Sequence, residues 1–164
     1  MGTQVTLEAS NLLMGTVRFL SFEIPEGWSA FPLGLVDAER SRLVGADRWV
    51  TSGYIVIGLA SSEGERISLK VDVAEPLRAF NLGKWLRKQR RRADSWGNVE
   101  INGHAGAYTI REVRRRIPRR REWVEATLCF YCDKTERRIR LEVIGERKES
   151  VAKILNSLFK LSCH

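Results

Sequence analysis

The segment Arg111-Glu-Val-Arg-Arg-Arg-Ile-Pro-Arg-Arg-Arg-Glu-Trp123 lies between two long strand-like segments. Residues 105–113 lead into it, and Trp123–Cys132 lead out of it with apolar side chains at alternate positions, which is typical of a strand. We therefore predict a long β-hairpin whose tip carries six arginines within residues 114–121. Opposed arginines repel across a hairpin, so the tip needs acids or a bound anion. The close acids are Glu112 and Glu122, and the sequence leaves their register open.

Charge is concentrated in the same part of the chain. The net charge is +8, and residues 81–121 contribute +10 of it with thirteen Lys or Arg against three acids, while the remainder carries −2. This asymmetry indicates an anionic partner such as nucleic acid, a phosphorylated ligand or an acidic protein face. A solvated arginine-rich surface is the alternative interpretation, and a high share of charged residues also occurs in proteins from hot environments.

Four other segments have the composition of strands, namely Val17–Ile24, Tyr54–Ala60, Ile67–Val73 and Ile139–Val143. The second is apolar nearly throughout, which places it inside a sheet. Turn signals separate the strands, and the Asn-Gly pair at 102–103 is the strongest hairpin signal among them. We interpret residues 29–47 as a long connection with a short helix near residues 37–43.

Two segments have helical spacing of apolar residues. The first begins after Asn81, a plausible N-cap, with Leu82, Trp85 and Leu86 on its apolar face. The second begins near Lys148 and contains apolar residues at 151, 154, 155 and 158. Strands and helices in this order predict an α+β domain with helices packed on a mostly antiparallel sheet. We place this single domain at residues 17–164 and interpret residues 1–16 as an N-terminal arm, dispensable if Met14 is the true start.

The polar face of the first helix and the hairpin tip are the predicted binding surface, because the planar guanidinium group of arginine suits phosphate and carboxylate groups. The candidate residues are Lys84, Arg87, Lys88, Arg90, Arg91, Arg92, Arg114, Arg115, Arg116, Arg119, Arg120 and Arg121.

Three stretches together resemble the PsbP-like and DcrB-like superfamily. Phe22-Glu-Ile-Pro-Glu-Gly-Trp28 is similar to the family's opening strand and its Pro-x-Gly-Trp turn, Val99-Glu-Ile-Asn-Gly-His-Ala-Gly-Ala-Tyr108 to a later strand turn, and Ile154-Leu-Asn-Ser-Leu-Phe159 to the closing helix. The family includes the extrinsic photosystem II protein PsbP, bacterial lipoproteins and an import factor that binds the Ran GTPase. The resemblance covers residues 17–159 and implies an α/β/α sandwich and a binding or assembly role, mostly without catalysis. The lipoproteins carry a signal and a lipidated cysteine, and since neither is found here a periplasmic role is not expected.

Cys129-Phe-Tyr-Cys132 and Cys163-His164 are the candidate metal ligands, because three thiolates and an imidazole would complete a tetrahedral zinc site. Residues three apart on a strand point to opposite faces, so we expect these cysteines to be buried small hydrophobes and expect no cofactor. A disulfide between Cys132 and Cys163 remains open if the tail lies beside that strand.

His104 is the histidine within the predicted fold, and a general base needs a partner within hydrogen-bond reach. The sequence offers no Ser-His-Asp ordering, no paired carboxylates and no phosphate-binding loop. We therefore expect His104 to be satisfied locally in its turn and the protein not to be an enzyme.

These observations predict a cytoplasmic, non-enzymatic binding or adaptor protein that recognises an acidic partner through its basic surface. Sequence-independent RNA or DNA binding through the same surface is one alternative, and a Cys/His metal-binding protein is another. No apolar run approaches the roughly eighteen residues that span a bilayer, and residues 1–10 do not form a secretory signal, so no membrane partner is expected. The sequence does not indicate the oligomeric state.

Overall fold

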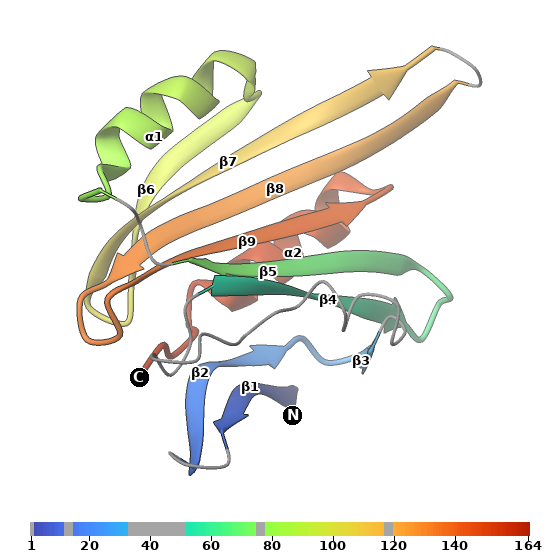
Figure 1. Ribbon diagram of the computed structural model, residues 1–164. Coiled ribbons are helices and arrows are strands. Elements are labelled where there is room, and N and C mark those ends of the chain that lie inside the picture. The colour runs from blue at the N-terminus through green and yellow to red at the C-terminus, as the bar shows by residue number, and fades with distance from the viewer. Residues whose placement is uncertain (1, 12–14, 33–51, 75–77, 117–119) are drawn as a thin grey trace.

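The computed structural model describes residues 2–11, 15–32, 52–74, 78–116 and 120–164. Within them lie a seven-stranded sheet, a separate two-stranded hairpin and two α-helices (Figure 1). The elements are β1 Thr3–Asn11, β2 Gly15–Ile24, β3 Trp28–Pro32, β4 Ser52–Ser61, β5 Arg66–Ala74, α1 Leu82–Gln89, the 3-10 helix η2 Arg90–Arg92, β6 Ser95–Ile101, β7 His104–Arg115, β8 Arg121–Cys132, β9 Arg137–Gly145 and α2 Lys148–Leu158. The predicted α+β class with a mostly antiparallel sheet is confirmed.

The large sheet has the strand order β3-β4-β5-β9-β8-β7-β6, and every neighbouring pair is antiparallel. The predicted β-hairpin is confirmed as β7 and β8, which pair from Gly106 with Phe130 to Arg115 with Arg121. The predicted Asn-Gly turn is also confirmed, because Asn102 and Gly103 have φ of 49° and 82° between β6 and β7. This left-handed conformation suits glycine and asparagine.

Two strands were not predicted. β1 pairs with β2, so residues that we interpreted as an arm form half of a hairpin; whether they can be removed stays a prediction. β3 is a short edge strand beside β4, within the segment interpreted as the start of a long connection. The helix predicted near residues 37–43 lies outside the described residues.

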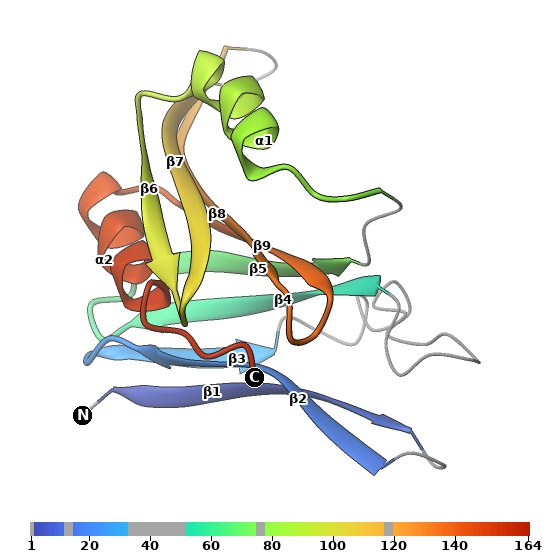
Figure 2. The same cartoon turned by 90° about the vertical axis from the view of Figure 1, so that its left-hand side faces the viewer.

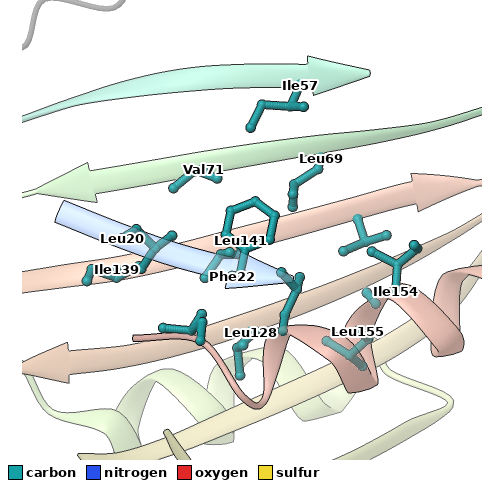
Figure 3. Packing of buried hydrophobic residues seen from close by; sticks show 14 of the residues in the cluster. Leu20, Phe22, Ile57, Leu69, Val71, Leu128, Ile139, Leu141, Ile154 and Leu155 are labelled. Atoms are coloured by element: carbon teal, nitrogen blue, oxygen red, sulfur yellow. The ribbon is translucent and has the colours of Figure 1, made fainter. Parts of the chain in front are cut away.

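The hydrophobic core lies on one face of the sheet, where β2 and α2 cover it (Figure 3). Alternation places the apolar side chains of β5, β8 and β9 on this face, and α2 adds residues spaced three and four apart. The labelled members of this core are Leu20, Phe22, Ile57, Leu69, Val71, Leu128, Ile139, Leu141, Ile154 and Leu155.

The first helix, α1, lies against the other face, over β7 and β8, so the two helices flank the sheet from opposite sides (Figure 2). Asn81 caps α1 as predicted, since its Oδ1 accepts the Lys84 backbone N–H at 2.8 Å. Trp85 and Leu86 turn inward, which leaves the basic residues of the helix outside. None of the described helices combines the length and apolarity needed to cross a bilayer.

Candidate functional site

The basic residues of α1 and η2 are all exposed. Two of them, Arg87 and Lys88, lie in the last turn of α1, where the negative end of the helix dipole favours cations. The three arginines of η2 follow directly, and the helix dipole does not account for so many additional positive charges. The predicted cations Lys84, Arg87, Lys88, Arg90, Arg91 and Arg92 therefore form one solvent-facing stripe.

The hairpin end carries the second basic run, and its register can now be stated. Arg114 is opposite Glu122, whereas Arg115 is directly opposite Arg121. Arg120 donates to Glu122 at 2.9 Å, and this hydrogen bond, followed by the charge of Arg120, lowers the pKa of the Glu122 carboxyl. One acid thus offsets part of the repulsion at the tip. Arg119 lies outside the described residues.

Three tip arginines have no ion pair with any residue that the structure describes, namely Arg115, Arg116 and Arg121. All three are exposed. Like charges directly opposite each other destabilise a strand pair, so an anion bound between them would relieve repulsion that the described residues leave in place.

The C-terminal end of α1 and η2 lie toward the same end of the molecule as the hairpin tip, whereas α1 begins nearer the other end of β8, where Phe80 stacks on Tyr131 with ring centres 6.5 Å apart (Figures 1 and 2). Asp94, which follows η2, joins them, because its backbone N–H donates to Ile110 and its carboxylate accepts the backbone N–H of Glu112. The end of the helical run is therefore fixed to β7 close to Arg114. We use the name basic end for the exposed cations of the two runs taken together, and the described members are Lys84, Arg87, Lys88, Arg90, Arg91, Arg92, Arg114, Arg115, Arg116, Arg120 and Arg121.

Trp96 was missed from the sequence, although it lies within the basic end. Its side chain is 46% exposed, and the Arg90 guanidinium lies 5.6 Å from the centre of its ring. The signal in the sequence was its place directly after the basic run, at the start of a strand. Trp85 and Trp123, which flank the two basic runs in the sequence, are half-buried, and Trp123 Nε1 donates to Glu125 at 2.7 Å.

Between α1 and the sheet lies a polar cavity of about 240 Å³. Most of the charged groups that line it are paired, because Arg111 bonds Glu125, and Arg140 lies 3.1 Å from Asp72. The exposed Arg92 lies at the same cavity, and we assign the cavity no ligand.

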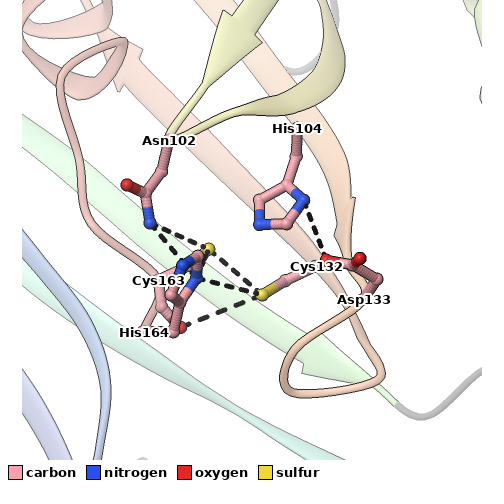
Figure 4. Close-up of polar contacts among 6 residues, drawn as sticks. All are labelled: Asn102, His104, Cys132, Asp133, Cys163 and His164. Atoms are coloured by element: carbon pink, nitrogen blue, oxygen red, sulfur yellow. Dashed lines mark hydrogen bonds and ion pairs between the residues drawn. The ribbon is translucent and has the colours of Figure 1, made fainter.

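The second candidate site is a compact group of cysteines and histidines near the end of β8 (Figure 4). Ligand atoms of His104, Cys132, Cys163 and His164 all lie within 4.8 Å of one another. The thiols of Cys132 and Cys163 are 3.2 Å apart and not bonded. Burial raises the pKa of the Cys163 thiol well above its usual value, and its contact with Cys132 adds to this shift.

The predicted metal-ligand candidates are only partly brought together. Cys132, Cys163 and His164 meet, because Ser162 forms a bridge to Ser21 that holds the tail against β2. Cys129 lies on the opposite face of β8, beside Arg138 and Arg140, and burial raises its pKa to about 12. The prediction that residues three apart on this strand face opposite ways is confirmed.

In the structure the fourth member of this group is His104, whereas the sequence had suggested Cys129. Its Nδ1 lies 3.2 Å from Asp133 Oδ1, so one nitrogen is satisfied locally as expected. Its Nε2, however, is buried and has no hydrogen-bond partner among the described residues.

Comparison with known proteins gives one structural similarity. The crystal structure of the Ran-binding protein Mog1p from Saccharomyces cerevisiae matches with a TM-score of 0.46 and 10% sequence identity, over 98% of this chain and 96% of that chain. No protein-family model matches the chain, and no curated protein sequence is similar to it.

Proposed function

We propose that this is a cytoplasmic, non-enzymatic binding or adaptor protein that recognises an acidic protein partner through the basic end. The observation that carries the proposal is the pair Arg115 and Arg121, which face each other at the tip without an ion pair to any described residue. An acidic side chain between them would turn a repulsive contact into an attractive one. The proposal also adopts the α/β/α layering that the resemblance to the PsbP-like and DcrB-like superfamily implies.

The shape of the hairpin supports the same proposal. β7 and β8 extend beyond β9, whose last residue Gly145 is level with Val124, so the hairpin end projects from the sheet. A projecting, charged element reaches a partner surface without the domain core having to approach it. Charges of this kind chiefly accelerate and orient association.

Sequence-independent binding of RNA or DNA is the second candidate, and Trp96 favours it. An exposed tryptophan beside arginines provides a face on which a base can stack, and such stacking contributes about 1–3 kcal/mol per base. If the partner is RNA or DNA, the W96A substitution should weaken binding strongly. If the partner is an acidic protein, W96A is not expected to do so.

The test is fluorescence anisotropy with two labelled probes, a glutamate-rich peptide and a single-stranded oligonucleotide, over a range of salt concentrations. The triple variant R115E/R116E/R121E should weaken peptide binding at least about tenfold. The matched control R66E/K153E/K160E makes the same change of net charge at exposed sites outside the basic end. Binding that both triple variants weaken equally, or no peptide binding at low salt, would refute the proposal, and tighter oligonucleotide binding that W96A removes would establish the second candidate.

A further inference from the structure

The cluster near the end of β8 has the composition and spacing of a metal site. It contains two thiols and two imidazoles, from Cys132, Cys163, His104 and His164. A tetrahedral ion with bonds of about 2.0–2.3 Å holds its ligand atoms about 3.3–3.8 Å apart. The Cys163 Sγ and Cys132 Sγ atoms lie 3.3 Å and 3.7 Å from His164 Nδ1. The two sulfur–nitrogen separations lie in this range. The 3.2 Å between the two sulfur atoms is about half an ångström shorter than the roughly 3.8 Å between two thiolates on one zinc ion, so the thiols would move slightly apart on binding.

His104 supplies an independent indication that a ligand belongs here. The contact between its Nδ1 and Asp133 sets the proton on Nδ1, which leaves a lone pair on Nε2. Buried polar atoms without a hydrogen bond are uncommon, and Nε2 is one of them. Figure 4 shows this nitrogen turned toward the two thiols. A metal ion would satisfy Nε2, and a carboxylate behind the other nitrogen is the arrangement that orients histidine ligands in zinc sites.

We propose that His104, Cys132, Cys163 and His164 bind one Zn²⁺ ion. Two sulfur and two nitrogen ligands in a tetrahedron suit zinc better than magnesium or calcium, which require oxygen ligands. Asn102 would stabilise the Cys163 thiolate without binding the ion, because its amide Nδ2 lies 3.6 Å from Cys163 Sγ and can donate a hydrogen bond to it. This inference does not depend on the proposed function of the basic end, whose hairpin tip lies at the opposite end of β7 and β8.

With four protein ligands the site has no open position, so its role is structural. The ligands come from three separate segments, since His104 begins β7, Cys132 ends β8, and the other two belong to the tail after α2. The ion would hold the tail against the sheet at the point where Leu161 and Cys163 enter the core.

Two other uses of the same side chains give different outcomes in the test. A disulfide between Cys132 and Cys163 would leave His104 Nε2 without a partner. A nucleophilic cysteine activated by His104 and Asp133 would need access to a substrate, but both thiols are 0% exposed, whereas reactive cysteines are partly exposed.

The first experiment measures the zinc content of the full chain, purified under reducing conditions with any affinity tag removed. We expect one zinc ion per chain, and Co²⁺ in its place should give the ligand-field absorption of a tetrahedral site together with a thiolate-to-cobalt charge-transfer band. Zinc well below one ion per chain, a Cys132–Cys163 disulfide in a protein that does not take up Zn²⁺ after reduction, or a cobalt spectrum without the charge-transfer band would each overturn the proposal.

Substitutions then assign the ligands. C132S and C163S should abolish the cobalt charge-transfer band, while C129S is the matched control because Cys129 is equally buried on the same strand but faces away. Substitutions of buried residues can prevent folding, so the deciding variants are at exposed residues. H164A removes a ligand. D133N removes the charge of the carboxylate that contacts the ligand His104, and the side chain of Asp133 is 68% exposed. D133N should weaken Zn²⁺ binding about 10- to 100-fold, and H164A should weaken it more. Unchanged affinity in both folded variants would refute the assignment.

Discussion

The hairpin tip of the basic end and the Cys/His cluster lie at opposite ends of β7 and β8, and the two regions differ in how their residues act. The basic end spreads eleven described cations over exposed positions, none of which is held in one geometry by the core. The cluster brings four ligand atoms within 4.8 Å of one another around two fully buried thiols. Exposed charges contribute weakly and cumulatively, whereas a closed metal site depends on every ligand.

Single substitutions are therefore informative in only one of the two regions. In the basic end one substitution changes binding slightly, so charge must be reversed at several positions. In the cluster one ligand decides whether the site exists.

Removal of zinc should have the largest effect. A ligand that binds only the folded chain stabilises it by about 4 kcal/mol at a thousandfold excess over its Kd, which corresponds to about 10 °C in Tm for a domain of this size. We therefore expect the chelated protein to melt about 10 °C below the zinc-loaded protein in calorimetry under reducing conditions. In H164A the chelator should have little effect, while in R115E/R116E/R121E the full difference should persist.

The sequence predicted those strands and helices whose spacing of apolar residues can be read within a single segment of the chain. Alternation identified β5, β8 and β9, and helical spacing identified α2. The pattern was also present in β1, where Val5 and Leu7 pack against the core, but the alternative start at Met14 led us to interpret residues 1–16 as an arm. β3 gives little signal because it has five residues and ends at a proline.

The Cys/His cluster was not predictable in full, because it depends on register and on a long-range contact. Gly106 pairs with Phe130. His104 lies two residues before Gly106 and Cys132 lies two residues after Phe130, so the antiparallel register brings them to the same end of the two strands. The sequence could not set this register across residues 117–118, so His104 was assigned only to its own turn. The approach of the tail depends on the bridge from Ser162 to Ser21, residues far apart in sequence.

Cys129 should behave as an inert thiol, in contrast to the cluster cysteines on the other face of β8. Burial raises its pKa from 9.0 to about 12, which lowers its thiolate fraction about a thousandfold at neutral or mildly alkaline pH. Alkylation of Cys129 by iodoacetamide, followed by peptide mass spectrometry, should therefore be about a thousandfold slower in the folded than in the unfolded protein. Chelation of zinc should not change this ratio as long as the chain stays folded.

The same shift gives a pH dependence with a defined sign. The folded-state pKa is higher than the unfolded one, so the folded state holds its proton more strongly, and stability falls as pH rises from about 9 toward 12. In C129A this part of the alkaline destabilisation should disappear. An identical alkaline profile for C129A and the unchanged protein in denaturant titrations would show that the thiol does not contribute.

A smaller effect of opposite sign is expected at the hairpin end. R121E replaces the like-charge contact with Arg115 by an attractive one, which should raise the free energy of unfolding by about 0.2–1 kcal/mol. Urea titration measures this gain, and anisotropy with the acidic peptide should show weaker binding in the same variant. R66E is the control, because Arg66 is opposite Ala60 and not opposite another cation. A loss of stability in R121E would mean that the tip arginines do not repel.

The smallest effect should come from Glu122, the acid that offsets part of the repulsion at the tip. The hydrogen bond from Arg120, and then its charge, lower the pKa of this exposed carboxyl from the ordinary 4.5. A carboxyl whose pKa is lower in the folded state stabilises the fold above its unfolded pKa, and this contribution is lost as pH falls. E122Q should therefore melt at a slightly lower temperature than the unchanged protein near neutral pH, and at the same temperature well below pH 4.5.

Salt should reduce the neutral-pH difference, since exposed ion pairs are screened, whereas salt should hardly change the stabilisation by zinc in its buried site. A Glu122 effect that resists both acid and salt would mean that the hairpin end is held as rigidly as the cluster, and the contrast between the two regions would fail.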